Sequence, residues 1–300
     1  MRLFAPLILP ALIAALLAGC ATAPVEPTAP VQPPATPAAK VPPRIGLALG
    51  GGAARGFAHV GVIQVLEEAG IRPNLVAGTS AGSLVAAIYA SGKNGAQLQQ
   101  VAETMEEAAI ADWSLQIFTR GALRGEALAR YVNSQVNSRL IENMPLPLGI
   151  VATDLNSGAD MLFQRGDTGT AVRASSSVPA VFQPVRISGR DYVDGGLVSP
   201  VPVRAARKMG ADLVIAVDIS SPPEGSAASG TLDILLQTFT IMGKSINTFE
   251  LKDADVVVRP ALLGVSSADF SARKRSIEAG RQAMLQALPQ LKSAIAAKTR

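Results

Sequence analysis

The chain has 300 residues, a length that can bury a substantial core in one large domain, and we expect a single globular body. Its net charge of +4 is mild, with acids and bases mixed and no interleaving of basic and aromatic residues, which argues against a nucleic-acid partner. The single cysteine excludes an intramolecular disulfide and a cysteine-based metal site.

Residues 1–19 are predicted to be a signal peptide. The apolar run Leu3–Ala18 contains two prolines and is shorter than the roughly 20 residues that span a membrane. It ends in Leu17-Ala18-Gly19-Cys20, which resembles a bacterial lipobox, so we expect acyl chains on Cys20 and a membrane anchor. The alternative is an ordinary signal peptide with an incidental cysteine. Ala21 replaces the Asp that would retain a lipoprotein at the inner membrane, so the resemblance implies the outer membrane, facing the periplasm.

Residues 20–43 combine this cysteine with a tether rich in Pro, Ala, Thr and Val, a composition that favours an extended, polyproline-like chain. Residues 44–300 form the predicted body. It opens with strand, turn and helix twice: Arg44–Leu49 leads through glycines into a helix over Phe57–Ala69, and Asn74–Gly78 leads into a helix over Ala81–Ala90.

The rest of the body continues this alternation. Further strands are predicted at Met161–Gln164, Leu148–Thr153, Leu213–Ile219, Asp255–Val258 and Val185–Val193, the last with a turn at Ser188-Gly189. Further helices are predicted at Ala96–Ile110, Glu126–Val136, Val201–Met209, Leu232–Phe249 and Ile277–Ala297. Strands that alternate with helices indicate an α/β fold with a mainly parallel sheet covered on both faces.

The run Gly78-Thr79-Ser80-Ala81-Gly82 falls between a predicted strand and a predicted helix. Gly-x-Ser-x-Gly in this setting is typical of the sharp turn that presents a nucleophilic serine, and the following helix N-terminus favours a developing oxyanion. Ser80 is therefore the predicted nucleophile of an acyl hydrolase, with a plain strand–helix turn as the alternative.

A serine nucleophile needs a base, and the chain contains one histidine. His59 lies upstream of Ser80, whereas α/β-hydrolases place their histidine last, so a packed or surface role fits it better. The best carboxylate is Asp194, which precedes Gly195-Gly196. It is predicted to act as the base, with turn capping as the alternative.

Gly50-Gly51-Gly52-Ala53 follows the first predicted strand. Successive backbone N–H groups of small residues can converge on an anion, which makes Gly51, Gly52 and Ala53 the predicted oxyanion hole. A dinucleotide-binding turn is the competing interpretation. It is disfavoured because Ala53 occupies the third glycine position of that motif and no acidic residue follows at the required distance.

The combination resembles the patatin-like phospholipase family, in particular its bacterial branch related to the neuropathy target esterase domain. The matching stretches are Gly50–Gly61, Gly78–Gly82, Val151–Gly158, Ala174–Pro184 and Tyr192–Pro200. The resemblance implies a three-layer α/β/α sandwich, a Ser80–Asp194 dyad and an oxyanion hole at the Gly51, Gly52 and Ala53 amides.

Two further positions bear on this resemblance. Ala53 departs from the glycine of many members, and a positive φ there would cost about 1 kcal/mol or more. Arg55 matches the family's basic residue and is predicted to steady the loop or attract a phosphate, with a surface arginine as the alternative. Asp154 and the loop Ser175–Pro179 also match, and no chemistry is assigned to them.

We therefore expect a lipid-anchored serine acyl hydrolase of phospholipase A, lysophospholipase or esterase type, acting on phospholipid or lysophospholipid through an acyl-enzyme without a metal or organic cofactor. A non-catalytic lipid-binding or assembly lipoprotein, an acyltransferase and a peptidase remain alternatives. Apolar residues between Ala108 and Phe118, including Trp113, are predicted to form a lid, a membrane contact or ordinary core. The sequence predicts no oligomeric state.

Overall fold

Residues 40–105, 123–221 and 230–300 are described in the computed structural model of the chain. Lys40–Arg300 form one compact unit, in which Val41 and Arg300 exchange backbone hydrogen bonds of 2.6 and 3.0 Å. This unit takes in the last residues of the predicted tether. The predicted signal peptide, Cys20 and the apolar stretch Ala108–Phe118 lie outside the described residues. None of the described helices has the length and apolar character to cross a membrane.

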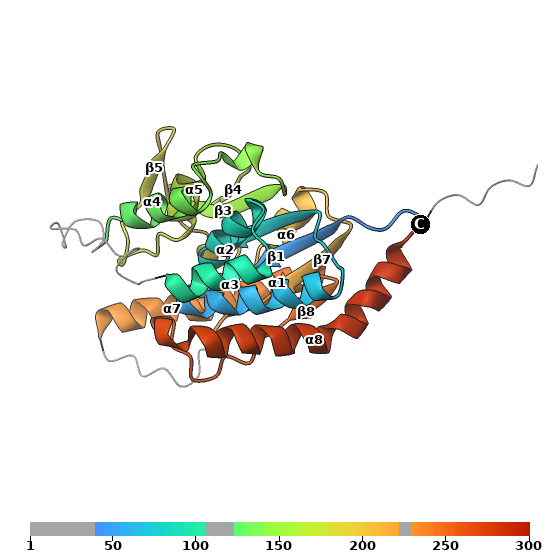
Figure 1. The fold of residues 1–300 in the computed structure, drawn as a ribbon. Coiled ribbons are helices and arrows are strands. Elements are labelled where there is room, and N and C mark those ends of the chain that lie inside the picture. The colour runs from blue at the N-terminus through green and yellow to red at the C-terminus, as the bar shows by residue number, and fades with distance from the viewer. Residues whose placement is uncertain (1–39, 106–122, 222–229) are drawn as a thin grey trace, which may run out of the picture. The chain divides into compact units, whose positions relative to one another are not determined.

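One mixed sheet runs through the compact unit, and Figure 1 shows its strands with helices on either side. The strands are β1 (Ile45–Leu49), β2 (Leu75–Thr79), β3 (Leu148–Asp154), β4 (Asp160–Phe163), β5 (Val185–Ile187), β6 (Arg190–Asp194), β7 (Leu213–Val217) and β8 (Val256–Val258). Their order is β5-β6-β3-β2-β1-β7-β8, with β4 paired to β3. Strands β3, β2, β1, β7 and β8 pair in parallel, whereas β4, β5 and β6 join by antiparallel pairing. The predicted mainly parallel sheet is confirmed.

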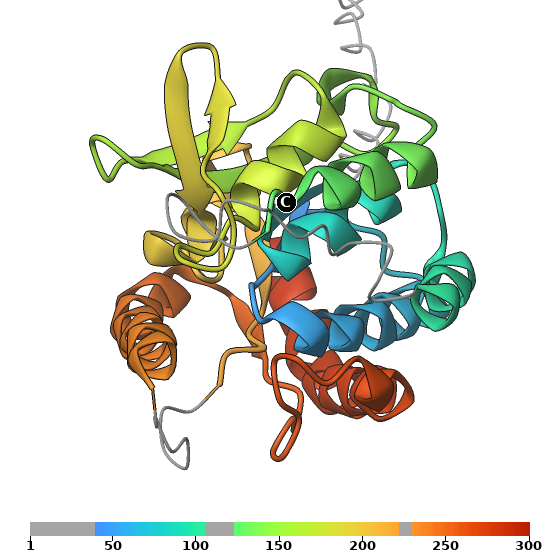
Figure 2. The same cartoon turned by 90° about the vertical axis from the view of Figure 1, so that its left-hand side faces the viewer.

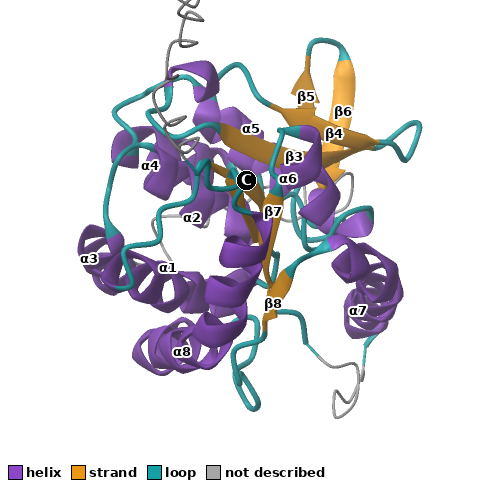
Figure 3. Cartoon of the chain, turned by 90° about the vertical axis from the view of Figure 1, so that its right-hand side faces the viewer, coloured by secondary structure: helices purple, strands orange, loops and turns teal. Residues whose placement is uncertain are grey.

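Helices flank the sheet and confirm the predicted α/β class. One face packs against α1 (Ala58–Glu68), α2 (Ala81–Ala90), α3 (Gly95–Thr104), α4 (Glu126–Gln135), α5 (Thr168–Ser175) and α8 (Arg273–Lys298). The other face packs against the short α6 (Val203–Lys208). Helix α7 (Thr231–Glu250) lies on the opposite side of β8 from α8, as the opposed views in Figures 2 and 3 show.

The structure departs from the predicted elements in a few places. The helix predicted over Phe57–Ala69 begins with a 3-10 turn, Ala53–Phe57, that precedes α1. The strand predicted over Val185–Val193 divides at its predicted turn into β5 and β6. Helix α5 was not predicted.

The strand register brings the ends of β2 and β6 together along β3. Thr79 ends β2 opposite Val151, and Asp194 ends β6 opposite Ala152, the next residue of β3. Strand β4 pairs with both of these β3 residues, so it occupies one edge of β3 while β2 and β6 share the other edge. The residue after Thr79, Ser80, therefore arrives beside Asp194.

Two glycines allow α1 and α8 to cross in direct backbone contact. A Cβ added at Gly61 would overlap the carbonyl oxygen of Ile277, and one added at Gly280 would overlap that of Ala58. Protein interiors are close-packed, so neither position accepts a side chain unless the two helices separate.

Gly280→Ala is expected to lower the free energy of unfolding by about 1–3 kcal/mol, because the methyl group forces α1 and α8 apart. Chemical denaturation of the purified protein measures this loss. Gly243→Ala in α7 is the matched control, since a Cβ there meets the Pro200 Cγ at an ordinary 3.6 Å and alanine favours a helix over glycine. An equal loss in both variants would contradict the explanation.

Candidate active site

Ser80 occupies the sharp turn between β2 and α2, with φ 53° and ψ −125°. A positive φ is uncommon for a residue other than glycine, and strain of this kind gathers at functional sites. The flanking glycines are required by contact, because a Cβ at Gly78 would overlap the Gly82 carbonyl oxygen and one at Gly82 would overlap that of Leu49. The Gly-x-Ser-x-Gly spacing thus builds the strained turn that the sequence predicted.

Asp194 lies at the end of β6, and its carboxylate is buried near the Ser80 hydroxyl, which stabilises the ionised form. Its Oδ1 accepts the N–H of Gly196 at 2.7 Å. Burial raises the pKa of Asp194 to about 6, against the opposing effects of the Gly196 N–H and the Ser80 hydroxyl. Asp194 is therefore a stronger base than an ordinary carboxylate and is still mainly ionised at pH 7.

The end of α5 and the loop after it hold Ser80 and Asp194 by their backbones. The Ser175 hydroxyl accepts the N–H of Ser80 at 2.8 Å and donates to the carbonyl of Val151 at 2.5 Å. The Asp194 N–H donates to the carbonyl of Ser177 at 2.9 Å. The sequence assigned no chemistry to the loop Ser175–Pro179. In the structure, the bonds of Ser175 and Ser177 fix the positions of Ser80 and Asp194 relative to each other.

The residues after β1, Gly50–Ala53, form a glycine loop that lies directly against Ser80, since a Cβ at Gly51 would be 3.1 Å from the Ser80 Cβ. The Gly51 N–H donates to the Pro200 carbonyl at 2.9 Å. The N–H groups of Gly52 and Ala53 have no acceptor among the described residues. Of the three amides predicted to form an oxyanion hole, these two are free to meet an anion, and Gly51 is already bonded.

Ala53 has φ 49°, in the left-handed region that favours glycine. Ala53→Gly is expected to keep kcat within about twofold and unfolding free energy within about 1 kcal/mol, because relief of strain offsets the greater freedom of the unfolded chain. Ala53→Val is expected to lower kcat about 10²-fold, because a β-branched residue resists positive φ and moves the amide. Steady-state kinetics on both variants measures this, and equal rates would contradict a role for this amide.

His59 is buried in α1 and supports the glycine loop. Its Nε2 donates to the Gly50 carbonyl at 2.8 Å, which requires the proton on that nitrogen. Burial lowers the pKa of His59 to about 4, so the ring is neutral at pH 7. The ring therefore bonds the loop and not the Ser80 hydroxyl. In the part of the chain that the structure describes, no group of three or more His, Cys, Asp and Glu side chains could hold a metal ion.

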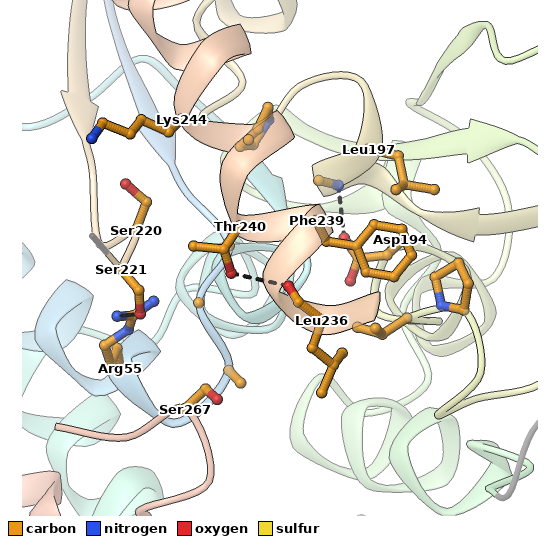
Figure 4. Close-up of a pocket in the computed structure, with 18 residues that line it drawn as sticks. Arg55, Asp194, Leu197, Ser220, Ser221, Leu236, Phe239, Thr240, Lys244 and Ser267 are labelled. Atoms are coloured by element: carbon orange, nitrogen blue, oxygen red, sulfur yellow. Dashed lines mark hydrogen bonds between the residues drawn. The ribbon is translucent and has the colours of Figure 1, made fainter. Parts of the chain in front are cut away.

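A cleft of about 260 Å³ opens beside Asp194 and the glycine loop. Its apolar lining consists of Val178, Pro179, Leu197, Pro200, Leu236 and Phe239. Its polar lining outside the loop and Asp194 consists of Arg55, Ser220, Ser221, Thr240, Lys244 and Ser267. Figure 4 shows Leu197 and Phe239 near Asp194, and Arg55 with Ser220 and Ser221 on the other side of the cleft. The site can therefore accept a molecule with an apolar part and a polar part.

The fold and the site together define an α/β protein with a serine at a strand–helix turn, at the carboxyl ends of parallel strands. The chain belongs to the patatin-like phospholipase family, whose model matches residues 47–207. Membership of this family supports a lipid acyl hydrolase activity.

Individual relatives agree with this assignment. The chain is 35% identical to an uncharacterized NTE family protein of Mycobacterium tuberculosis over 68% of this chain and 56% of that one. It is 32% identical to the human patatin-like phospholipase domain-containing protein 6 over 74% of this chain and 16% of that one. The chain thus spans about half of the mycobacterial relative and a small part of the human one. Among solved structures, VipD from Legionella pneumophila has a TM-score of 0.57 at 16% identity, covering 83% of this chain and 67% of that one, which shows a shared fold.

Proposed function

We propose that the protein is a serine acyl hydrolase that cleaves carboxylic esters of phospholipids or lysophospholipids. The observation that carries this proposal is the placement of Ser80, in its strained turn at the end of β2, beside the end of β6 and its buried Asp194, whose pKa is raised to about 6. A neighbouring pair of free amides and a cleft with an apolar wall supply what an ester of a fatty acid requires.

The reaction needs only these groups. As Ser80 attacks the ester carbonyl, Asp194 takes the hydroxyl proton, and the amides of Gly52 and Ala53 bind the oxyanion. The carbon–oxygen bond to the alcohol then breaks, and the alcohol leaves with the proton from Asp194. Water attacks the acyl-enzyme and gives a proton to Asp194, which returns it to Ser80 as the fatty acid leaves.

Labelling of the full-length protein with a fluorophosphonate, together with release of fatty acid from lysophospholipid, tests the proposal. We expect phosphonate on Ser80 and free fatty acid as the product. A protein that is neither labelled nor active on lysophospholipid, phospholipid and nitrophenyl esters would be the non-catalytic lipoprotein. Transfer of the acyl group to an added alcohol or amine in preference to water would identify an acyltransferase.

The rate of hydrolysis is expected to depend on pH through Asp194. The base form is the ionised carboxylate, so kcat/KM should rise as pH increases and reach half its plateau near pH 6, the pKa of Asp194. Initial rates between pH 4.5 and 8 with a neutral ester measure this. A plateau that extends down to pH 4.5 would contradict a base with a raised pKa.

We also propose that acyl chains on Cys20 anchor the protein at the outer membrane, facing the periplasm. The support is the lipobox-like Leu17-Ala18-Gly19-Cys20 and the alanine that follows it. Cys20→Ala is expected to abolish incorporation of labelled palmitate and to remove the protein from the membrane fraction, because several acyl chains make a lasting anchor. Unchanged palmitate labelling of this variant would contradict the proposed attachment site.

A further inference from the structure

Helix α7 has an inverted distribution of polar and apolar side chains. Its two buried residues, Asn247 and Glu250, are both polar. Its large apolar side chains that are 36% to 69% exposed are Leu232, Ile234, Leu236, Ile241, Met242 and Phe249. A surface helix ordinarily turns its apolar side to the core and its polar side to solvent. A contiguous exposed apolar surface of this kind marks a contact with a partner or a membrane.

The apolar side chains of α7 form an outer face that continues towards the active site. The outer face, on the side away from Asn247 and Glu250, consists of Ile234, Ile241, Met242 and Phe249. These four are spaced seven or eight residues apart, which places them on one side of a helix. Leu236 is exposed as well, and together with Phe239 it lines the cleft (Figure 4). The apolar surface of α7 therefore reaches the wall of the cleft.

The hydroxyl groups of α7 form hydrogen bonds within the helix itself. Thr238, Thr240, Ser245 and Thr248 each donate to the carbonyl oxygen four residues earlier, at 2.9 to 3.3 Å. Polar groups in a bilayer find no water, so they have to be satisfied internally, and Ser and Thr achieve this through the carbonyl four residues earlier. Thr238 and Ser245, which lie among the apolar side chains of the outer face, therefore do not need water.

The contacts of α7 suit a helix that lies on a membrane. No described helix, α7 included, has the length and apolar character to cross one. At the end of α7 the Lys252 ammonium lies 5.1 Å from the centroid of the Phe249 ring, and interfacial segments combine such cations with aromatic rings. On the side away from the outer face, Glu250 accepts the Ser199 hydroxyl at 2.6 Å. The body thus holds α7 by its polar side and leaves the outer face uncovered by any described residue.

We propose that the outer face of α7 docks on a lipid bilayer and lies in its interfacial region. The choice of lipid as the partner rests on the proposed acyl hydrolase function. A bilayer against the outer face brings acyl esters to the helix whose Leu236 and Phe239 line the cleft, whereas a second copy of the chain would cover this approach. The internally bonded hydroxyls of α7 also favour a surface without water.

Quenching of a tryptophan on α7 by brominated lipids tests the docking without using hydrolysis. The full-length chain carries Ser80→Ala, Phe249→Trp and Trp113→Phe, the last of which removes its one native tryptophan. The vesicles contain phosphatidylethanolamine and phosphatidylglycerol, with or without bromine on the upper part of the acyl chains. We expect brominated lipids to lower the emission about twofold, because an interfacial helix buries its apolar side about 5–10 Å deep.

Leu285→Trp in place of Phe249→Trp is the matched control. Leu285 is 43% exposed on α8, and α8 lies on the opposite side of β8 from α7 (Figures 2 and 3). An acyl anchor on Cys20 would hold both proteins at the same vesicles, so only contact through α7 separates them. We expect no quenching in the control.

Changing the outer face itself tests whether its apolar area carries the docking. Ile234→Ser combined with Ile241→Ser is expected to lower the inserted fraction of α7 about tenfold, because two side chains lose their burial in lipid. Both isoleucines are more than half exposed, so the fold does not depend on them. Leucine at the same two positions keeps the apolar area and should keep the quenching.

Four results would overturn the docking. They are an unquenched Phe249→Trp, equal quenching of Phe249→Trp and Leu285→Trp, quenching unchanged by the two serines, and a stable dimer without vesicles that shields the tryptophan of Phe249→Trp, which would identify a second copy as the partner. Quenching through α7 in a chain whose wild type hydrolyses no ester would contradict the proposed function and leave the docking standing. Hydrolysis without quenching would do the reverse.

Discussion

Ser80→Ala is expected to lower kcat for lysophospholipid by about 10⁴- to 10⁶-fold, because it removes the atom that forms the acyl-enzyme. The cleft and the amides of Gly52 and Ala53 stay in place, so KM should change little. Fatty acid release measured by mass spectrometry provides the rates. Ser91→Ala is the matched control, since the Ser91 hydroxyl donates to the Ile88 carbonyl just after the last residue of α2, at the other end of that helix from Ser80. A loss smaller than about tenfold would show that another residue is the nucleophile.

A double variant tests whether Ser80 and Asp194 act as one unit. Ser80→Ala combined with Asp194→Asn is expected to lose no more activity than Ser80→Ala alone, because without the serine hydroxyl the carboxylate has no proton to take. Groups that act as one unit show such non-additive losses. Losses that multiply in the double variant would mean that Ser80 and Asp194 act independently.

Local sequence patterns were sufficient to predict the turn that contains Ser80 and the strand that leads to Asp194. The serine turn has a short spacing whose glycines are required by contact within the turn and with the adjacent strand, so its motif predicts its geometry. Because the chain has a single histidine, a carboxylate is expected as the base, and Asp194 ends a strand beside Ser80. The sequence favoured a packed or surface role for His59, and its bond to Gly50 in a buried position shows the packed one.

Contacts between distant segments could not be predicted in this way. Helix α5 is short, and its eight residues include two threonines and one serine. Its formation depends on packing against α4 and β3. The bond from Gly51 to Pro200 joins loops that are far apart in sequence, so nothing in the glycine run indicates which amides stay free. The depth at which Arg55 is buried depends equally on the surrounding fold.

Ser199 links the backbone next to Ser80 and the backbone next to Asp194 to α7. Its carbonyl accepts the Thr79 hydroxyl at 2.8 Å, and its N–H donates to the Gly195 carbonyl at 2.9 Å. Its own hydroxyl donates to the buried Glu250, at the end of α7, at 2.6 Å. Thr79 precedes Ser80 and Gly195 follows Asp194, so this one residue ties the backbones beside both side chains to the helix that lines the cleft.

Asp194→Asn is expected to lower kcat about 10⁴-fold while preserving the fold. An asparagine has nearly the same shape, and its amide oxygen can still accept the N–H of Gly196, but the side chain cannot take the proton of Ser80. The residual rate should also lose the inflection near pH 6, because the group that titrates there is gone. Rates across pH with a neutral ester measure both effects.

Fluorophosphonate labelling separates a lost base from a lost nucleophile. Asp194→Asn should label slowly at Ser80, because the hydroxyl and its strained turn remain, whereas Ser80→Ala should not label at all. Asp191→Asn on the same strand is the matched control and should keep both the rate and the inflection. An inflection near pH 6 that survives in Asp194→Asn would assign the base to another group, since the pKa of about 6 belongs to the buried Asp194 carboxylate.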